Sequence, residues 1–304
     1  MFELPQDIRV FERGWLSSNN ILFLAGQANT LVDSGYASHA QQTCQLIQAS
    51  LGDAPLHQLV NTHLHSDHCG GNAALQATWP QVRTLIPPGL AGSVRHWDRA
   101  TLSYEPTGQQ CPPFKFEATL TPGSVVRCGV RELQVLAAPG HDPHAVVLFE
   151  PELGLLLSAD ALWENGFGVV FPQLDGEVGF DEVSQTLDLM ESLAVRCVIP
   201  GHGSPFTDVA SALQRARARL RKYQADPIFH ARYAAKVLVK FRLLEVQRET
   251  LHDLLRWLDQ TPYFKTLHQR FFVAMPWINW TQELLSDLQR AGALQMQDGW
   301  VLNL

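Results

Sequence analysis

The first two thirds of the chain alternate short apolar runs with segments of helical periodicity. The apolar runs predict strands within 21–26, 29–35, 57–63, 82–88, 124–130, 132–140, 145–150, 154–160 and 196–203. Apolar positions at helical spacing predict helices over 38–51, with Ser38 as its N-cap, and over 180–193. This βαβ-like alternation predicts an α/β domain over residues 1–209.

From Asp208 onward the pattern becomes helical. Apolar residues recur at helical spacing over 209–224, 227–243, 249–260, 264–272 and 281–294. The last of these segments runs into ALQMQDGWVLNL, in which Asp298-Gly299 is a two-residue hairpin signal between apolar strands. Helices followed by a hairpin are the order of a winged-helix unit. We therefore predict a second, mostly helical, winged-helix-like domain over residues 210–304.

Charge changes at the same place as the hydrophobic pattern. Residues 210–304 hold 14 Lys and Arg against 8 Asp and Glu, a net of +6, whereas residues 1–209 hold 9 against 22, a net of −13. The basic residues concentrate in one predicted helix, at Arg215, Arg217, Arg219, Arg221 and Lys222. Most are spaced two apart, so they spread around that helix. The pattern suits a solvated helix, one that contacts a phosphorylated carrier such as coenzyme A, or one that contacts RNA.

Composition and cysteine usage place the protein among ordinary globular proteins. With 46% hydrophobic and 17% charged residues the chain is neither disordered nor fibrous. No stretch reaches the roughly 20 apolar residues that a membrane span needs, and the N-terminus lacks the basic and apolar regions of a signal peptide. Five scattered cysteines without a CxxC pair indicate neither a disulfide framework nor a thiolate zinc site. We expect a cytoplasmic protein with reduced thiols.

The segment NTHLHSDHCGGN carries the strongest chemical signal. His63, His65, Asp67 and His68 fall within six residues after a predicted strand, followed by two glycines. On a turning loop the first two side chains can converge on one metal ion, and the next two can face a second. Imidazole and carboxylate ligands without thiolate suit zinc, iron or manganese. The sequence therefore predicts a metal site after this strand.

Three more residues of the same chemical kind end other predicted strands. They are His141 in APGHDPH, Asp160 in LLLSAD and His202 in IPGHGSP. With HxHxDH, this set resembles the metallo-β-lactamase fold superfamily of hydrolases over roughly residues 10–207. Asp33 in TLVDSG matches an early acidic residue that lies beneath the metal site in that family. The resemblance implies an αββα sandwich.

The resemblance also implies roles for these residues. One metal ion is held by His63, His65 and His141, a second by Asp67, His68 and His202, and Asp160 bridges both. The cofactors are then two divalent ions, with zinc favoured over iron or manganese. A hydroxide between the metals is the nucleophile, and Asp67 is the catalytic residue that orients it and passes a proton to the leaving group.

Residues near these motifs are weaker candidates for substrate contact. They are His144, Trp163 and Asn165, the last two in a segment that follows Asp160. A longer segment containing Trp97 and Tyr104 is expected to form a flap over the site. Cys69, directly after His68, is expected to be a buried structural thiol.

The motifs look most like those of the glyoxalase II group and its thioesterase and lactonase relatives. The domain order resembles that of the β-lactamase-like protein 2 type. Asp142 stands where Thr or Ser is more usual in that group. We therefore favour hydrolysis of a small-molecule thioester, other acyl ester or lactone. The alternatives are a metal-dependent nuclease or phosphodiesterase that uses the basic tail, and a non-haem iron oxygenase of the persulfide type. Nucleic acid is a less favoured partner, a membrane is not expected, and a homodimer is an ordinary expectation.

Overall fold

The computed structural model describes residues 2–304 and divides into two compact units. The first contains the chain up to Leu102 together with Gln110–Arg221, and the second contains Ser103–Gln109 and Lys222–Leu304. The change of unit falls inside helix α7 (Val209–Ala225). The domain boundary that we place at 209/210 stays a prediction, and it lies at the first residue of this helix.

Two β-sheets form the framework of the first unit. In the first sheet β1 to β3 are antiparallel neighbours and β3 to β6 are parallel, in the order β1 (Ile8–Phe11), β2 (Asn20–Phe23), β3 (Thr30–Val32), β4 (Gln58–Val60), β5 (Arg83–Ile86), β6 (Ala118–Thr119). In the second sheet only the β10 and β11 pair is parallel, and the order is β11 (Cys197–Pro200), β10 (Leu155–Ala159), β9 (Val146–Glu150), β8 (Arg131–Ala137), β7 (Val125–Cys128).

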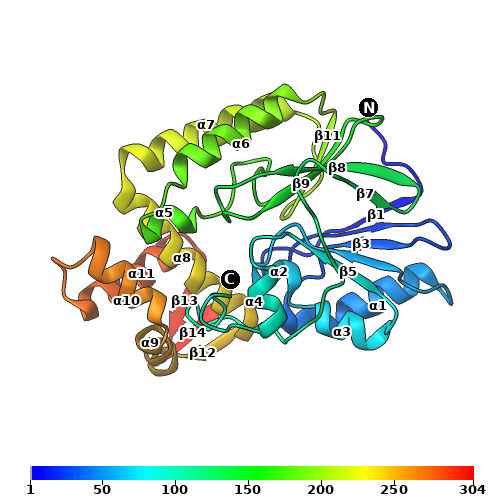
Figure 1. Ribbon diagram of the computed structural model, residues 1–304. Helices are drawn as coiled ribbons and strands as arrows, with labels where there is room; N and C mark the ends of the chain where they lie inside the picture. Colours follow the sequence, from blue (N-terminus) through cyan, green and yellow to red (C-terminus); the bar gives the residue numbers. More distant parts are fainter. Residues whose placement is uncertain (1) are drawn as a thin grey trace. The chain divides into compact units, whose positions relative to one another are not determined.

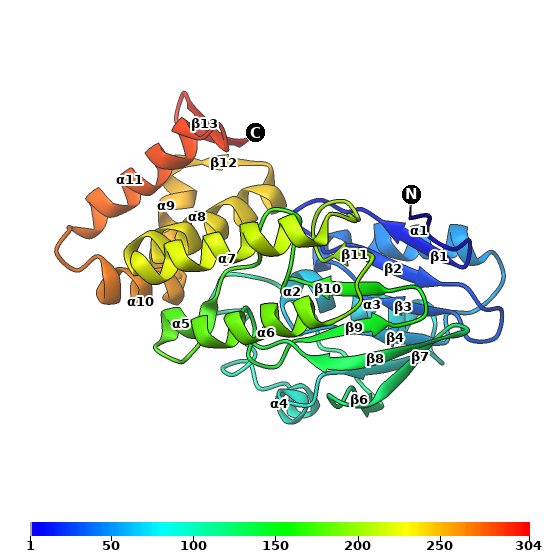
Figure 2. The same ribbon diagram turned by 90° about the horizontal axis from the view of Figure 1, so that it is seen from above.

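The two sheets face each other, and helices cover their outer sides (Figures 1 and 2). Helices α1 (Ala40–Leu51) and α3 (Asn72–Thr78) lie outside the first sheet, and α6 (Phe180–Ser192) lies outside the second. Alternate residues of a strand point to opposite faces. Thus Phe23 and Val32 join the core between the sheets, whereas Leu22 and Leu31 pack beneath α1 and α3. These four layers confirm the expected αββα architecture.

The start of the first helix differs from its prediction. Residues Ala37–His39 form a 3-10 turn, and α1 begins only at Ala40. His39 occupies the N-cap position and makes no side-chain cap bond. Ser38 lies inside the preceding turn, so the expectation that it caps the helix was wrong.

Several short elements had no sequence prediction. They are too short for a periodicity to register, or their apolar pattern is incomplete. They comprise β1, β6, α3, α2 (Ser66–Cys69), α4 (Ala91–His96) and α5 (Phe171–Asp175), whereas β12 (Arg248–Thr250) takes the first two residues of the helix expected over 249–260. Of these, α2 matters most, because it carries two of the candidate ligands.

The second unit is mostly helical, as expected. After α8 (Pro227–Val246) come β12, α9 (Leu251–Gln260), α10 (Pro262–Phe271), α11 (Trp277–Arg290), and the hairpin β13 (Leu294–Gln297) and β14 (Trp300–Asn303). The hairpin turns at Asp298 and Gly299, both with positive φ (50° and 77°), and β12 pairs with β14. Assignment of this unit as a winged helix stays a prediction. Within residues 2–304, none of the helices combines the length and hydropathy that crossing a membrane requires.

The segment expected to form a flap is packed. The Trp97 ring meets the Phe114 ring edge-on with centroids 5.5 Å apart. Residues 103–109 belong to the second unit, where the Tyr263 backbone N–H donates to the Pro106 carbonyl at 3.0 Å. Tyr104 is buried there. The Trp97 ring thus has a structural partner and Tyr104 is buried, and substrate contact by either ring stays a prediction.

Candidate metal centre

The seven predicted ligands all lie in segments that follow strands of the first unit. His63 and His65 follow β4, and Asp67 and His68 lie on α2 directly after them. The other three follow strands of the second sheet: His141 after β8, Asp160 after β10 and His202 after β11. Because strands of a packed sheet hold their ends still, these segments present ligands in a fixed arrangement. The structure brings all seven residues together in two clusters.

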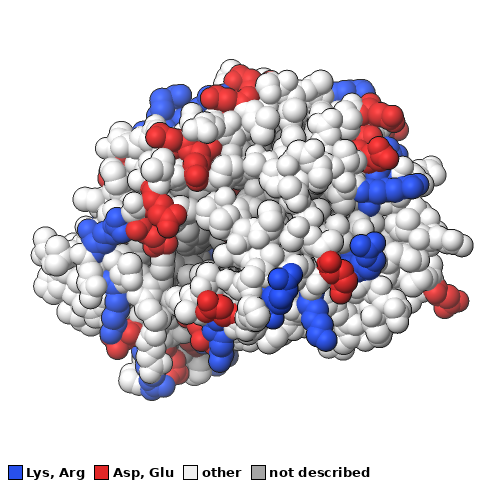
Figure 3. Space-filling view, viewed as in Figure 1, with Lys and Arg blue, Asp and Glu red and all other residues white. Residues whose placement is uncertain are grey.

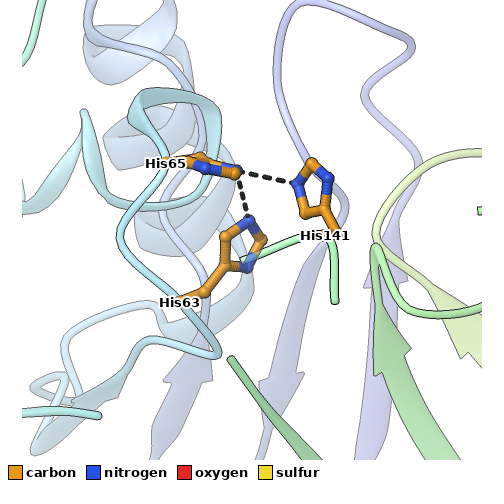
Figure 4. Close-up of side chains that lie close together, drawn as sticks. All are labelled: His63, His65 and His141. Atoms are coloured by element: carbon orange, nitrogen blue, oxygen red, sulfur yellow. Dashed lines mark hydrogen bonds between the residues drawn. The ribbon is translucent and has the colours of Figure 1, made fainter. Parts of the chain in front are cut away.

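The first cluster consists of three histidines whose ring nitrogens converge (Figure 4). His65 Nδ1 lies 3.1 Å from His63 Nε2 and 2.7 Å from His141 Nε2. Burial, and then the neighbouring His68, lowers the pKa of His63 well below its usual value, and burial lowers the pKa of His141 to about 4. The imidazoles are therefore neutral and carry lone pairs, which is the form that binds metal.

The second cluster combines two histidines with two carboxylates. His202 Nε2 lies 3.1 Å from one oxygen of Asp67 and 3.7 Å from Asp160, and His68 Nε2 lies 3.4 Å from Asp160. Burial opposes the charge of Asp160, yet His202 and His68 hold its pKa well below the usual range, so it is a carboxylate. Asp160 also lies 3.4 Å from His141 of the first cluster. Asp160 thus lies within reach of both clusters.

The outer ring nitrogens of three of these histidines are held by acceptors. His68 Nδ1 donates to Asp33 at 2.8 Å, His202 Nδ1 to the Gly14 carbonyl at 2.9 Å, and His141 Nδ1 to the Val169 carbonyl. These bonds assign a proton to Nδ1 and direct Nε2 inward. Asp33 itself accepts from the Thr62 N–H (2.9 Å) and hydroxyl (2.8 Å), and it lies beneath the site as expected.

One buried atom tests whether a cation fits. His68 Nε2 is fully buried and forms no well-aligned hydrogen bond with any residue in 2–304, although Asp160 lies 3.4 Å away. A buried polar atom without a hydrogen bond is costly, and it calls for an ion or water at that place. Imidazole and carboxylate side chains without thiolate form a donor set for a divalent ion. The residues therefore fit a metal ion.

Two glycines make room for the ligands. A Cβ at Gly201 would collide with an oxygen of Asp160, and a Cβ at Gly168 would collide with His141 Nδ1. Neither position has a positive φ, so the requirement for glycine comes from space alone. Gly201 is the first glycine of the PGHG motif. It must be glycine because it faces the Asp160 carboxylate, which follows the neighbouring strand β10.

Replacing Gly168 by Ala is expected to displace the His141 ring and to weaken metal binding by about tenfold or more, as other changes next to ligands do. Metal affinity measured by competition with a chromophoric chelator checks this. The matched control is Gly92→Ala on α4, because a Cβ at Gly92 would meet nothing within 4 Å. Equal affinity in both variants would show that the His141 ring is not constrained in this way.

Three basic residues of α7 have partners within the first unit. Arg215 Nε donates to the Glu164 carbonyl at 2.7 Å, and Arg219 donates to the Phe167 carbonyl at 3.2 Å. Arg217 pairs with Asp188 and Glu191 on α6, at 2.7 and 2.6 Å. Arg215 and Arg219 thus anchor the loop after Asp160, a role that the spacing of charges did not reveal.

The weaker substrate candidates lie near the centre, and their roles stay predictions. Trp163 Nε1 donates to Asp160 at 3.1 Å, and Asn165 is exposed in the turn that follows. His144 donates its backbone N–H to the Asp142 carboxylate at 2.7 Å. Its side chain helps to line a small pocket together with His63, Leu64, Pro87, Leu90 and Asp142.

Sequence reasoning missed the loop between β1 and β2. Trp15 in this loop is 56% exposed and stacks on the His202 ring, with centroids 5.3 Å and planes 12° apart. Its ring also meets Trp163 edge-on at 5.1 Å. The adjacent Gly14 supplies the carbonyl that orients His202. Nothing in the local sequence ERGWLSSN signals this, because the partner histidine lies 187 residues away in the chain.

Histidine and carboxylate side chains gathered at the strand ends of two facing sheets define a metalloprotein of the α/β class. Residues 13–202 match a protein-family profile that is described as "Metallo-beta-lactamase superfamily". The chain belongs to this superfamily. The matched range contains all seven candidate ligands, which agrees with the resemblance seen in the sequence.

Similarity to individual proteins extends this assignment. A hydroxyacylglutathione hydrolase from Synechococcus is 32% identical over 149 residues, which cover 49% of this chain and 51% of the relative. An acyl-coenzyme A thioesterase, MBLAC2, from Gallus gallus is 26% identical over 225 residues, or 64% of this chain and 76% of the relative. The chain thus spans about half the length of the former and three quarters of the latter.

Among solved structures, a metallo-beta-lactamase family protein from Thermus thermophilus has the same fold. Its TM-score is 0.60 at 20% identity, with 99% of this chain and 100% of that chain covered. A beta-lactamase domain protein from Burkholderia ambifaria gives a TM-score of 0.57 at 22% identity, covering 100% and 93%. At this level of identity the likeness shows the fold alone.

Proposed function

We propose that the protein is a metal-dependent hydrolase that cleaves a small-molecule thioester or a related acyl ester or lactone. The observation that carries the proposal is the convergence of seven imidazole and carboxylate donors in two adjoining clusters. We assign His63, His65 and His141 to one divalent ion, and Asp67, His68 and His202 to a second, with Asp160 between them. Zinc is our first choice for both.

The protein's own residues would divide the work as follows. Bound divalent ions supply a water of lowered pKa and polarise the carbonyl under attack. Asp67 is the most exposed side chain of the second cluster, at 14%, so it is the carboxylate that a substrate can reach. We infer that Asp67 orients the attacking water and delivers its proton to the leaving group. Asp33 and the carbonyls of Gly14 and Val169 keep the histidine rings in place.

Two kinds of support favour a thioester. The relatives named above include a hydroxyacylglutathione hydrolase and an acyl-coenzyme A thioesterase, and both names describe thioester cleavage. A thiolate is also a good leaving group, so the single proton that Asp67 takes from the attacking water suffices for its departure. The intact set of candidate ligands in the first unit is what such a reaction requires.

The nuclease alternative receives less support from the surface. Three of the five clustered basic residues of α7 are engaged with protein carbonyls or carboxylates. On the face shown in Figure 3, acidic and basic side chains are interspersed, and neither sign forms a continuous stripe. Phosphate backbones are bound by grouped cations. Cytoplasmic location and a homodimer remain predictions.

A substrate panel tests the proposal. We expect the metal-loaded protein to hydrolyse at least one of S-lactoylglutathione, a short-chain and a long-chain acyl-coenzyme A, and a γ-lactone. Thiol release from the thioesters is followed with a chromogenic reagent, and acid release from the lactone with a pH indicator. Single-stranded RNA and glutathione persulfide with oxygen serve as the competing substrates. Metal-dependent RNA cleavage, or oxygen uptake with persulfide, in the absence of ester hydrolysis would contradict the proposal.

A further inference from the structure

A pair of thiols lies beside the metal centre. Cys69 Sγ and Cys111 Sγ are 3.8 Å apart, and both residues are reduced. Cys69 is the last residue of α2 and directly follows His68, whereas Cys111 is half-buried in a segment without regular secondary structure. We propose that these two residues are a modification site, at which a small-molecule disulfide oxidises the pair to a reversible Cys69–Cys111 disulfide. This inference does not rest on the proposed hydrolysis.

One member of the pair is held rigidly. Cys69 Sγ donates to the His65 carbonyl at 3.3 Å, which fixes its direction. The two glycines that follow pack against backbone: a Cβ at Gly70 would lie 2.6 Å from the Ala37 nitrogen, and one at Gly71 would lie 2.5 Å from the Ser34 oxygen. Such close packing leaves α2 little freedom to shift. The buried sulfur therefore stays near its partner.

The other member lies where it can close the distance. A disulfide needs its sulfur atoms about 2.05 Å apart, so the present separation must shrink. Cys111 lies on irregular chain, and its neighbour Gln110 is tied to this region by its N–H, which donates to the Tyr36 hydroxyl at 3.0 Å. Because the chain is anchored one residue away, Cys111 stays near Cys69, and we expect rotation of its side chain to shorten the distance between the two sulfurs.

The remaining cysteines are poorer targets. Burial raises the pKa of Cys128 to about 12 and also raises the pKa of Cys197, which keeps both as unreactive thiols. Cys44 is half-buried, and its sulfur accepts a bond from the Thr78 hydroxyl at 3.5 Å. Cys44 and Cys111 are both half-buried, but for Cys111 the contact is with a second sulfur, that of Cys69. Oxidation is expected to be selective for the pair.

The reaction balances with a small disulfide as oxidant. The Cys111 thiolate, having lost its proton to water, attacks one sulfur of the reagent, and the other half leaves as a thiolate. Cys69 then attacks the Cys111 sulfur of this mixed disulfide, its proton passing to the second departing thiolate. Two protein thiols are oxidised by two electrons, and one reagent disulfide is reduced to two thiols.

The expected product is a covalent link across 42 positions of the sequence, between α2 and residue 111. Closing a loop of that length restricts the unfolded chain, so the oxidised protein should melt several degrees higher than the reduced protein. A thiol reductant should reverse the shift. The link would also join the helix that carries Asp67 and His68 to a second segment.

The test treats the full-length, metal-loaded protein with 2-hydroxyethyl disulfide under native conditions. We expect two of the five thiols to be lost per chain, and a melting temperature that rises and then falls again on reduction. Digestion after Lys and Arg and before Asp separates the sites, since Cys69 falls in 67–83, Cys111 in 100–115 and Cys44 in 33–52. Mass spectrometry should find 67–83 joined to 100–115.

Two variants sharpen the result. Cys111→Ser should abolish both the linked peptide and the melting shift, whereas the matched control Cys44→Ser should retain them. The inference is overturned if Cys111 stops at a mixed disulfide while Cys69 stays reduced, if no thiol reacts, or if Cys69 links to Cys44. Because the wild-type digest alone decides among these outcomes, the test does not depend on how well a variant folds.

Discussion

Replacing Asp67 by Asn should lower kcat for the best substrate of the panel by about 10²- to 10⁴-fold, the usual contribution of a general acid or base. Asparagine keeps the size of the side chain but can neither carry the negative charge nor accept the proton. Its partner in the centre is His202, whose Nε2 lies 3.1 Å from the carboxylate. Steady-state kinetics on metal-saturated protein gives the measurement.

The control for this variant is Asp98→Asn, on an exposed loop where the carboxylate bonds to nearby backbone and to Thr101. It should leave kcat unchanged. Metal content is measured on both proteins, so that loss of metal can be separated from loss of proton transfer. An Asp67→Asn protein that binds metal and keeps wild-type kcat would refute the role given to this carboxylate.

The second large effect is expected at Asp33. This buried carboxylate accepts from the Thr62 N–H and hydroxyl and from His68 Nδ1. In Asp33→Asn the amide NH₂ would face donors, leaving a buried mismatch that costs about 1–3 kcal/mol of stability. With the hold on the His68 ring lost, affinity for metal should fall about 10- to 100-fold.

Two measurements check the Asp33 prediction. Denaturant unfolding of the metal-free proteins gives the change in stability, and chelator competition gives the change in affinity. The matched control is Asp53→Asn, an exposed aspartate in the turn after α1. If the Asp33→Asn protein matched the wild type in both stability and metal affinity, the idea that the Asp33 hydrogen bond holds the His68 ring would be wrong.

Much of the fold could be predicted because its signals are local. Most strands of the two sheets, though not β1 and β6, show as apolar runs, and six of the seven ligands stand in runs of His, Asp and Gly that follow such strands. A cluster of metal-ligand residues can be recognised in the sequence without knowing how the chain packs. The four-layer arrangement followed from the family resemblance that these motifs carried.

The parts that escaped prediction depend on contacts between distant residues. Trp15 and Gly14 are positioned against His202 by tertiary packing, and the partners of Arg215 and Arg219 are backbone carbonyls of another loop. Charge spacing along a helix cannot show which side chains are engaged in this way. Ser38 failed as a cap because the 3-10 turn before α1 takes up the position that a simple helix start would use.

The most direct test of the account is the metal content of freshly purified protein, by elemental analysis, beside that of His63→Ala. We predict close to two divalent ions per chain in the wild type, and a loss of at least one ion together with all ester hydrolysis in the variant. A wild-type protein that hydrolyses the substrate with no bound metal, or a variant that keeps both metal content and activity, would contradict the central claim.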